Sequence, residues 1–328
     1  MAKPLMSICF TCYNRKKFVR EALQSALDQT YEPLEIVISD NGSTDGTAEI
    51  VTEMVEKYRA NGGVHKIVLN CNERNIGGSD NIQKCYSLAS GELLISAHDD
   101  DISLPNRVET IANAWIEHGC KPLAIIHASY LIDTSDKVIG YLDDKGLDHP
   151  LQAATAYSPK LFQMYHIDWG DCPEDIFFTR IAAMLGEVVV LKDRIMKYRV
   201  GCGVSASATT DNRPTLKMLY AAELRSAKRL YSDLDNLKSR MSDDDYIMWR
   251  KRIDGWKRVA EGGLNLVSSN SFVARWNGFL AVHEGGYLNM RTIGQLLYVL
   301  PQWIGDPLLR FSNLINRIRR RLWHSRSF

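Results

Sequence analysis

The sequence predicts an α/β fold in which a mainly parallel sheet is flanked by helices and followed by a helical C-terminal region. Short apolar runs of strand length alternate with segments whose apolar residues recur at helical spacing. After Pro214 the chain becomes helical and charged. Strands that alternate with helices pair in parallel through right-handed crossovers, and this gathers the strand-to-helix loops at one edge of the sheet.

The first half of the chain contains four such strand-and-helix repeats. We expect strands at 5–10, 34–39, 66–69 and 93–97, and helices at 14–29, from the loop after 46 to about 59, at 79–89 and at 106–118. The loops that follow the strands are polar and lie at 11–15, 40–45, 72–78 and 99–101. Open α/β sheets bind their ligands at the edge where such loops meet.

The second half continues with a hairpin and then with helices. Residues 123–133 and 138–142 are rich in β-forming side chains and flank a turn at 134–137. The polar stretch 143–159 is expected to be irregular, either as the rim of a binding site or as a plain connection. The remaining expected elements are a helix that ends at 185, a strand at 188–191, a helix at 216–231 and a helix after Ser242.

An acidic triplet ends the fourth expected strand. Asp99, Asp100 and Asp101 follow the apolar run 93–97, and adjacent carboxylates at the end of a buried strand repel one another and are costly to desolvate. A cation is therefore expected beside them. The spacing of Asp99 and Asp101 suits a magnesium or manganese ion that bridges a diphosphate.

A second acidic triplet, 243–245, provides a comparison within the chain. No apolar strand precedes it, and a helical pattern follows it. Ser242 with Asp245 has the spacing of a capping box, and acids suit the positive end of a helix. We therefore interpret the second triplet as structural.

Composition excludes several classes of function. The 328 residues carry 40 basic and 39 acidic side chains, so no overall charge favours a nucleic-acid partner. Apolar runs of membrane-spanning length and a signal-peptide pattern are both missing from the sequence, which predicts a cytoplasmic protein. Seven scattered cysteines suit a reducing compartment, and Cys9-x-x-Cys12 lacks a second pair or a nearby His that would complete a zinc or redox site.

The loop after the first strand has none of the glycines that hold a pyrophosphate in dinucleotide folds or Walker loops, so a diphosphate here would be held through a metal ion. In order and spacing, the polar loops resemble those of family 2 glycosyltransferases, which have the Rossmann-like GT-A fold. The matching stretches are TCYNR at 11–15 (the family's TYNR with Cys12 inserted), EIVISDNGSTDGT at 35–47, NERNIG at 72–77, ASGE at 89–92 and DDD at 99–101.

The resemblance implies a nucleotide-sugar donor bound at this edge of the sheet. Thr11 and Tyr13 would line the nucleoside pocket, with the Tyr13 ring against the base. Asp40 would accept a hydrogen bond from the base, and Arg74 or Asn75 would flank it. Among nucleotide sugars, the resemblance favours a UDP-sugar.

The resemblance also places the sugar and a metal ion at the first acidic triplet. Asp99 would contact the ribose or the sugar, and Asp101 would bind Mn²⁺ or Mg²⁺. The family's downstream Arg and Ser recur as Arg199 and Ser205, but Gly201 stands where many relatives carry a metal-binding His. Metal binding would then rest on Asp101, the diphosphate and water. The further candidates for donor contacts are Arg15, Asp100, Arg199 and Ser205.

Inverting transfer, which is also implied by the resemblance, needs a carboxylate that takes the proton of the acceptor hydroxyl. Residues 168–178 resemble the family's acidic motif at the start of a helix. We expect Asp175 to be this base, with Glu174 and Asp171 as alternatives. Acids in a first helical turn also occur simply as partners of the helix dipole.

Three regions are therefore expected. Residues 1–120 would bind the nucleotide sugar, 121–213 would form the acceptor-binding and catalytic-base half of the same domain, and 214–328 would be helical. The last segment, 307–328, has six arginines, no acid and apolar residues on one helical face. This pattern is typical of a basic amphipathic helix on an anionic membrane, and a partner-binding helix or a solvated tail are the alternatives.

The resemblance favours a glycan or lipid-linked acceptor of a surface polysaccharide, such as lipopolysaccharide O-antigen or capsule. The site of action would be the inner face of the cytoplasmic membrane. Two other functions stay open at this point. A nucleotidyltransferase that makes nucleotide sugars would share the sheet, and a non-catalytic sugar-nucleotide or glycan-binding module would share the donor pocket without a base.

Overall fold

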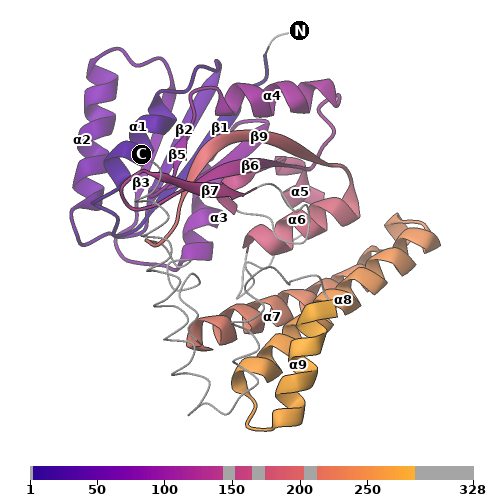
Figure 1. The fold of residues 1–328 in the computed structure, drawn as a ribbon. Helices are drawn as coiled ribbons and strands as arrows, with labels where there is room; N and C mark the ends of the chain where they lie inside the picture. The colour runs from indigo at the N-terminus through magenta and orange to yellow at the C-terminus, as the bar shows by residue number, and fades with distance from the viewer. Residues whose placement is uncertain (1–2, 143–151, 165–173, 203–212, 285–328) are drawn as a thin grey trace, which may run out of the picture. The chain divides into compact units, whose positions relative to one another are not determined.

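The computed structural model describes residues 3–142, 152–164, 174–202 and 213–284 (Figure 1). They divide into two compact units. The first comprises Met1–Gly170 and Glu174–Gly203, and the second comprises Asp171–Pro173 and Val204–Phe328.

The first unit begins with the four predicted strand-and-helix repeats. Its strands are β1 (Met6–Cys12), β2 (Leu34–Asp40), β3 (Lys66–Cys71) and β4 (Leu93–His98), and its helices are α1 (Val19–Leu27), α2 (Thr47–Ala60), α3 (Gly78–Leu88) and α4 (Arg107–Glu117). The elements that follow β4 are β5 (Ile102–Ser103), β6 (Ala124–Ile132), β7 (Val138–Leu142), η2 (Gln152–Ala154), β8 (Thr155–Tyr157), α5 (Pro159–Met164), α6 (Glu174–Leu185) and β9 (Val188–Arg199).

The sheet has the strand order β3-β2-β1-β4-β8-β6-β9-β5, and β7 pairs with β6. Strands β1 to β4 are parallel, as predicted, and β6 with β7 forms the predicted antiparallel hairpin. The register places Asp40 beside Cys12 and Cys71, and His98 beside Thr11. The loops after these four strands therefore share one edge of the sheet.

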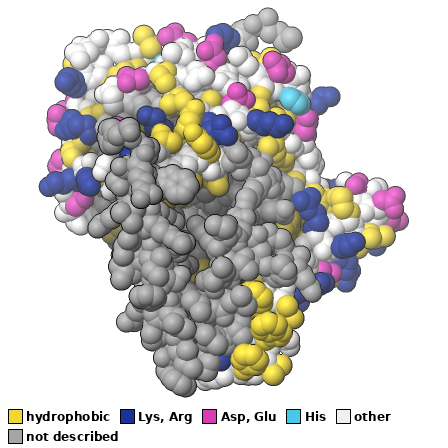
Figure 2. All heavy atoms as spheres, viewed as in Figure 1, with side chains coloured by type: hydrophobic (Ala, Val, Ile, Leu, Met, Phe, Trp, Pro, Cys, Tyr) yellow, Lys and Arg dark blue, Asp and Glu magenta, His cyan; other side chains and the backbone are white. Residues whose placement is uncertain are grey.

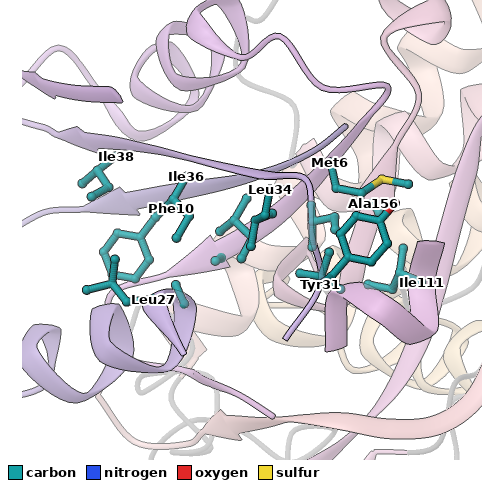
Figure 3. Packing of buried hydrophobic residues seen from close by; sticks show 14 of the residues in the cluster. Met6, Phe10, Leu27, Tyr31, Leu34, Ile36, Ile38, Ile111 and Ala156 are labelled. Carbon is teal, nitrogen blue, oxygen red and sulfur yellow. The ribbon is translucent and has the colours of Figure 1, made fainter. Parts of the chain in front are cut away.

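The main core lies between one face of the sheet and helices α1, α2 and α4. Alternate residues of β1 and β2 point into it, and they include Phe10, Ile36 and Ile38 (Figure 3). Tyr31 and Ile111 pack at the other end of this cluster (Figure 3). Helix α3 packs against β1 and β2. Its buried Cys85 thiol lies 3.4 Å from the Val37 carbonyl oxygen, so α3 covers the opposite face.

Two local expectations are wrong. Helix α1 begins at Val19 rather than at 14, because the preceding residues form a turn that bonds to the loop after β2. Asn14 adopts φ 51° there, outside the helical region. The stretch 143–159, expected to be irregular, contains the buried strand β8 between β4 and β6. A three-residue strand is too short to give a periodic pattern, so pairing alone defines it.

The second unit contains the helices α7 (Arg213–Leu237), α8 (Asp243–Ser268) and α9 (Phe272–Glu284), with the short turn η4 (Lys238–Arg240) between α7 and α8. Ser242 caps α8 and accepts a 3.1 Å hydrogen bond from the Asp245 backbone N–H, so the second acidic triplet is structural, as predicted. Gly262 and Gly278 bring α8 and α9 close together, since a Cβ on Gly278 would lie 2.3 Å from the Gly262 carbonyl oxygen. Of the helices that the structure describes, none has both the length and the hydropathy needed to cross a bilayer.

Candidate functional site

The first acidic triplet lies at the carboxyl edge of the sheet, directly after β4. Asp99 accepts a 2.7 Å hydrogen bond from the Tyr13 backbone N–H. Asp101 Oδ1 accepts a 2.8 Å bond from the Arg199 backbone N–H. Asp101 is 5% exposed, and its Oδ2 has no hydrogen-bond partner in the described part of the chain. The triplet thus joins the loop after β1 to the end of β9 while one buried carboxylate oxygen stays unused.

Burial raises the pKa of two of the three carboxyl groups, those of Asp99 and Asp101. Burial and the neighbouring Asp100 raise the pKa of Asp99 from 3.8 to about 8, against the opposing effects of the Tyr13 N–H and of Arg15. The same two causes raise the pKa of Asp101 well above its usual value. Shifts in this direction mark carboxyl groups whose ionised form lacks enough positive charge nearby. A cation would therefore be stabilised beside them.

The Arg15 guanidinium lies beside the triplet. Its Nε is 3.9 Å from Asp99 Oδ1 and 3.7 Å from Asp100 Oδ2, and the Arg15 backbone N–H is held by Thr47 Oγ1 at 2.8 Å. Both ion-pair distances are longer than a hydrogen bond. Arg15 therefore supplies positive potential without occupying the carboxylate oxygens.

The resemblance predicts a donor contact for Arg199, but the structure gives its side chain other partners. Arg199 is 2% exposed. Its Nε donates to the Asp100 carbonyl at 2.8 Å, its Nη1 to the Asp133 carbonyl at 3.1 Å, and its Nη2 to Glu21 Oε2 at 3.1 Å. Nη1 also pairs with Asp136. With its guanidinium engaged in this way, Arg199 positions the triplet against the β6–β7 turn and α1.

Arg107, the first residue of α4, is a second buried arginine near the triplet. It donates from Nη2 to the Ser96 carbonyl at 2.8 Å, from Nη1 to Ser103 Oγ at 3.0 Å, and from Nε to His127 Nε2 at 3.1 Å. Burial lowers the pKa of Arg107 to about 10, and the charge of Asp101 opposes this shift. Arg107 is not among the residues predicted from the sequence. Its position at the start of a helix is a signal in the sequence, because a cation at the positive end of a helix is unfavourable without compensating contacts.

The expected nucleoside pocket lies next to the triplet. Tyr13 follows β1 and is 38% exposed. Asp40 ends β2 and is buried, with Oδ2 accepting from the Ser43 N–H at 2.8 Å and Oδ1 accepting from Ser43 Oγ at 2.5 Å. A base that bonded to Asp40 would share these oxygens with Ser43. The Cys12 thiol is influenced by both Asp40 and Asp99. Burial raises its pKa most, and the charges of these two carboxylates raise it further.

The loop that carries Arg74 and Asn75 is held against the end of β2. Asn41 Nδ2 donates to Asn75 Oδ1 at 3.0 Å, and Asn41 Oδ1 accepts from the Ile76 N–H at 2.9 Å. Gly42 has φ +68°, and a Cβ there would lie 2.4 Å from the Arg74 carbonyl carbon. Only glycine permits this approach. The structure thus brings Arg74, which is exposed, to the same edge as Tyr13.

The residues present fit a metal ion only in part. Among the described residues, no three His, Cys, Asp or Glu side chains converge as a ready-made metal site. The unpaired Oδ2 of Asp101 fits one bond to a hard cation, whose other ligands would come from a diphosphate and water. Glu174 and Asp175 begin α6, but their side chains lie outside the described residues, as do Asp171 and Ser205 entirely.

Two side chains beside the triplet add to the predicted set. His98 ends β4 next to Thr11, and burial lowers the pKa of His98. The Cys202 thiol donates to Asp100 Oδ2 at 3.5 Å. Burial and the charge of Asp100 raise the pKa of Cys202 to about 12. Both could have been found from the sequence by their neighbours, because His98 directly precedes the triplet and Cys202 directly follows Gly201.

Comparison with known proteins agrees with this arrangement. The family model described as glycosyl transferase family 2 matches residues 7–126, which extend from β1 into β6. This chain carries a family 2 glycosyltransferase domain. The predicted motif loops of the domain are those that meet at the carboxyl edge of β1 to β4.

Relatives of the domain occur in distant organisms. An uncharacterised glycosyltransferase of Rickettsia prowazekii is 34% identical over 134 residues, which are 40% of this chain and 38% of the relative. An uncharacterised glycosyltransferase of Methanocaldococcus jannaschii is 32% identical over 111 residues, which are 33% of this chain and 36% of the relative. The chain therefore spans less than half of the length of these relatives.

Solved structures share the fold over most of the chain. The structure of S. aureus TarS 1-349 has a TM-score of 0.56 at 15% identity and covers 92% of this chain and 82% of its own. The mannosyltransferase PcManGT of Pyrobaculum calidifontis has a TM-score of 0.52 at 16% identity, with 98% and 88% covered. The fold is the predicted GT-A glycosyltransferase fold.

Proposed function

We propose that this protein transfers a sugar from a nucleotide-diphosphate donor to a hydroxyl group, with inversion at the anomeric carbon. The observation that carries the proposal is the buried, unpaired Oδ2 of Asp101 beside Asp99 and Asp100. It lies at the edge where the motif loops of the family 2 domain meet. A site with this much uncompensated negative potential suits a divalent cation that arrives with a diphosphate.

Donor recognition would use the loops around the triplet. The exposed Tyr13 ring would stack on the base, Asp40 would accept a hydrogen bond from it, and Arg74 or Asn75 would flank it. Arg15 would face the diphosphate. TarS has been crystallised with UDP-GlcNAc, and PcManGT with GDP-Man and Mn²⁺. We propose a donor of the same class, a nucleotide-diphosphate sugar, for this chain, and among these the family resemblance favours a UDP-sugar.

In the transfer step, Asp101 would hold Mn²⁺ or Mg²⁺, with Asp99 beside it. When bound, the ion supplies Lewis-acid stabilisation to the departing diphosphate. Arg199 bonds to the Asp100 carbonyl, and Arg107 bonds to Ser96 and Ser103 on either side of the triplet. These contacts would keep the carboxylates in position during transfer. Asp175 in the first turn of α6 would remove the proton of the acceptor hydroxyl as it attacks the sugar. The alternatives for this base are Glu174 and Asp171.

The proposed acceptor is a glycan or a lipid-linked precursor of a surface polysaccharide. Residues 121–213 would bind it and supply the base, and residues 1–120 would bind the donor. The arginine-rich segment 307–328 would attach the protein to the inner face of the cytoplasmic membrane. This attachment rests on the sequence pattern of that segment, which has no acid.

A calorimetric titration of nucleoside diphosphates, with and without Mn²⁺, tests the proposal. We expect one nucleotide to bind tightly only with the metal, and Asp101→Asn to abolish this metal dependence. Asp244→Asn, in the structural triplet, is the matched control and should bind as the native chain does. If no nucleotide binds under any condition, the proposed donor site is wrong.

Turnover assays separate the other two functions. Asp175→Asn should retain donor binding and lose about 1000-fold in sugar transfer, as expected for removal of a general base. Comparison with Glu174→Gln identifies which acid acts. Release of pyrophosphate from a nucleoside triphosphate would instead identify a nucleotidyltransferase. Donor binding without transfer by the native chain to any acceptor would identify a binding module.

A further inference from the structure

An apolar stripe lies exposed on helix α9 of the second unit. The side chains of Phe272, Val273, Trp276 and Leu280 share one side of the helix and are 56%, 65%, 41% and 37% exposed. The rings of Phe272 and Trp276 stack with centroids 6.5 Å apart. Hydrophobic side chains gather at the place where Figure 1 draws α9, in the lower part of the view in Figure 2. We call these four side chains the α9 stripe.

The sequence around the stripe is almost free of charge. Residues 262–282 contain a single charged side chain, Arg275, which is 4% exposed and adds little to the surface. The preceding residues 243–261 of α8, by contrast, contain ten charged side chains. Along the chain, the run of charged side chains in α8 thus ends before the α9 stripe begins.

The stripe lies mostly outside the core of the second unit, and only the Trp276 ring approaches a core side chain, with its centroid 5.8 Å from that of Phe279. One core cluster of this unit contains Leu266, Val267 and Phe279, with Leu216 and Tyr220 packed against it. Contact between the glycines of α8 and α9 adds to this packing. Neighbouring aromatic and aliphatic side chains that stay this exposed are typical of an interaction surface.

The chain that follows α9 indicates what covers the stripe. It continues for 44 residues after Glu284, and its last segment, 307–328, carries six arginines and no acid. Aromatic side chains settle at the headgroup level of a bilayer, and an arginine-rich segment of the same chain attracts anionic lipids.

We propose that the α9 stripe is a membrane-contact surface that enters the headgroup region of an anionic bilayer. It extends the membrane attachment proposed above to side chains that the structure describes, and it does not depend on sugar transfer. The stripe supplies apolar contact, and the arginines supply electrostatic attraction. Stable attachment of a peripheral protein commonly needs two such signals.

Vesicle co-sedimentation of the full chain tests this proposal. The vesicles are mixed phosphatidylglycerol and phosphatidylcholine, with pure phosphatidylcholine for comparison. The double variant Phe272→Ser with Trp276→Ser should weaken binding to the anionic vesicles about tenfold or more, because two large apolar side chains lose their buried area. The matched control is Ile247→Ser with Met248→Ser, which removes exposed apolar side chains at the start of α8. It should change binding less than about twofold.

Folding and oligomeric state are measured on the same samples. Both double variants should keep the native helical circular dichroism and the native nucleotide affinity, which separates this proposal from the proposed donor site. Equal vesicle binding by the stripe variant and the control would overturn the proposal. So would a native chain that does not bind anionic vesicles, or a native dimer that the stripe variant dissociates with no change in vesicle binding.

Discussion

The two edges of the sheet in the first unit each bury a carboxylate and treat it in opposite ways. At the amino edge, Glu35 of β2 accepts hydrogen bonds from Ser7 Oγ at 2.8 Å and from the N–H and Oγ of Ser90, both at 2.7 Å. It also pairs with Lys66 Nζ at 2.5 Å. At the carboxyl edge, Asp101 accepts one backbone hydrogen bond, and its other oxygen is unpaired.

The pKa values of the two groups differ accordingly. Burial acts to raise the pKa of Glu35, but the bonds from Lys66, Ser90 and Ser7 outweigh it, and the pKa is lowered. Burial and Asp100 raise the pKa of Asp101, and its single backbone bond does not compensate. Burial of a carboxylate therefore does not by itself indicate function. A buried carboxylate without enough hydrogen bonds or positive charge around it does indicate function, because a ligand can supply the missing partners.

Asp101→Asn should give the largest effect. We expect sugar transfer to fall on the order of 100-fold or more, because the variant loses the charge that would hold the metal at the diphosphate. The thermal midpoint should not fall, since the substitution replaces an unsatisfied carboxyl group with an uncharged amide of the same shape. Turnover and thermal unfolding are measured together. If the variant kept native turnover, Asp101 would not be a functional carboxylate, and the proposed difference between the two edges would be wrong.

Glu35→Gln should show the reverse pattern. The amide cannot accept all the hydrogen bonds that Glu35 receives, and we expect a loss of roughly 2 kcal/mol in the free energy of unfolding. Nucleotide binding should be unchanged, because the amino edge is remote from the loops of the site. Urea unfolding and calorimetry provide the two measurements. A loss of donor affinity with native stability would contradict the structural role of Glu35.

The two edges should also give opposite pH dependence of stability in metal-free protein. The lowered pKa of Glu35 stabilises the fold above its unfolded value of 4.5, and this stability is lost as the pH falls through the folded value. Asp99 is raised from 3.8 to about 8, so its contribution is full below 3.8 and is lost as the pH rises to about 8. Urea unfolding in chelator from pH 3 to 9 tests this.

In that series, Glu35→Gln should flatten the acid limb of the stability curve, and Asp99→Asn should flatten the decline between about pH 4 and 8. Each variant serves as the control for the other. Parallel curves for the native chain and both variants would show that neither carboxyl group titrates as its surroundings indicate.

Lys66→Met should have the smallest effect. The Lys66 side chain is 62% exposed, so its ion pair with Glu35 is weakened by solvent, and we expect a loss of about 1 kcal/mol or less. Ser7 and Ser90 still bond to Glu35 in this variant. A loss as large as that of Glu35→Gln would show that the ion pair, rather than the serine bonds, satisfies the carboxylate.

Much of the first unit could be predicted from local pattern. The runs at 34–39 and 93–97 became β2 and β4 because a buried parallel strand needs a continuous apolar stretch. The late start of α1 and the strand β8 could not be predicted in this way. Asn14 is drawn out of a helix by the loop after β2, and β8 exists through its pairing with β4 and β6.

The candidate site divides in a similar manner. The triplet and Tyr13 were visible because polar loops after parallel strands must share an edge. The role of Arg199 was not, since its partners come from elements far away in the sequence. Arg199 bonds to Glu21, 178 residues away, and to Asp100, 99 residues away.

By itself, the sequence determined the order of strands and helices from β1 to β4, the capped second triplet and the place where carboxylates gather, because these depend on periodicity and on neighbours in the chain. Only the tertiary structure decided which carboxylates are satisfied, which arginines are buried and which apolar side chains of α9 remain exposed. Those properties depend on hydrogen-bond partners and on burial. Both arise only when distant segments pack together.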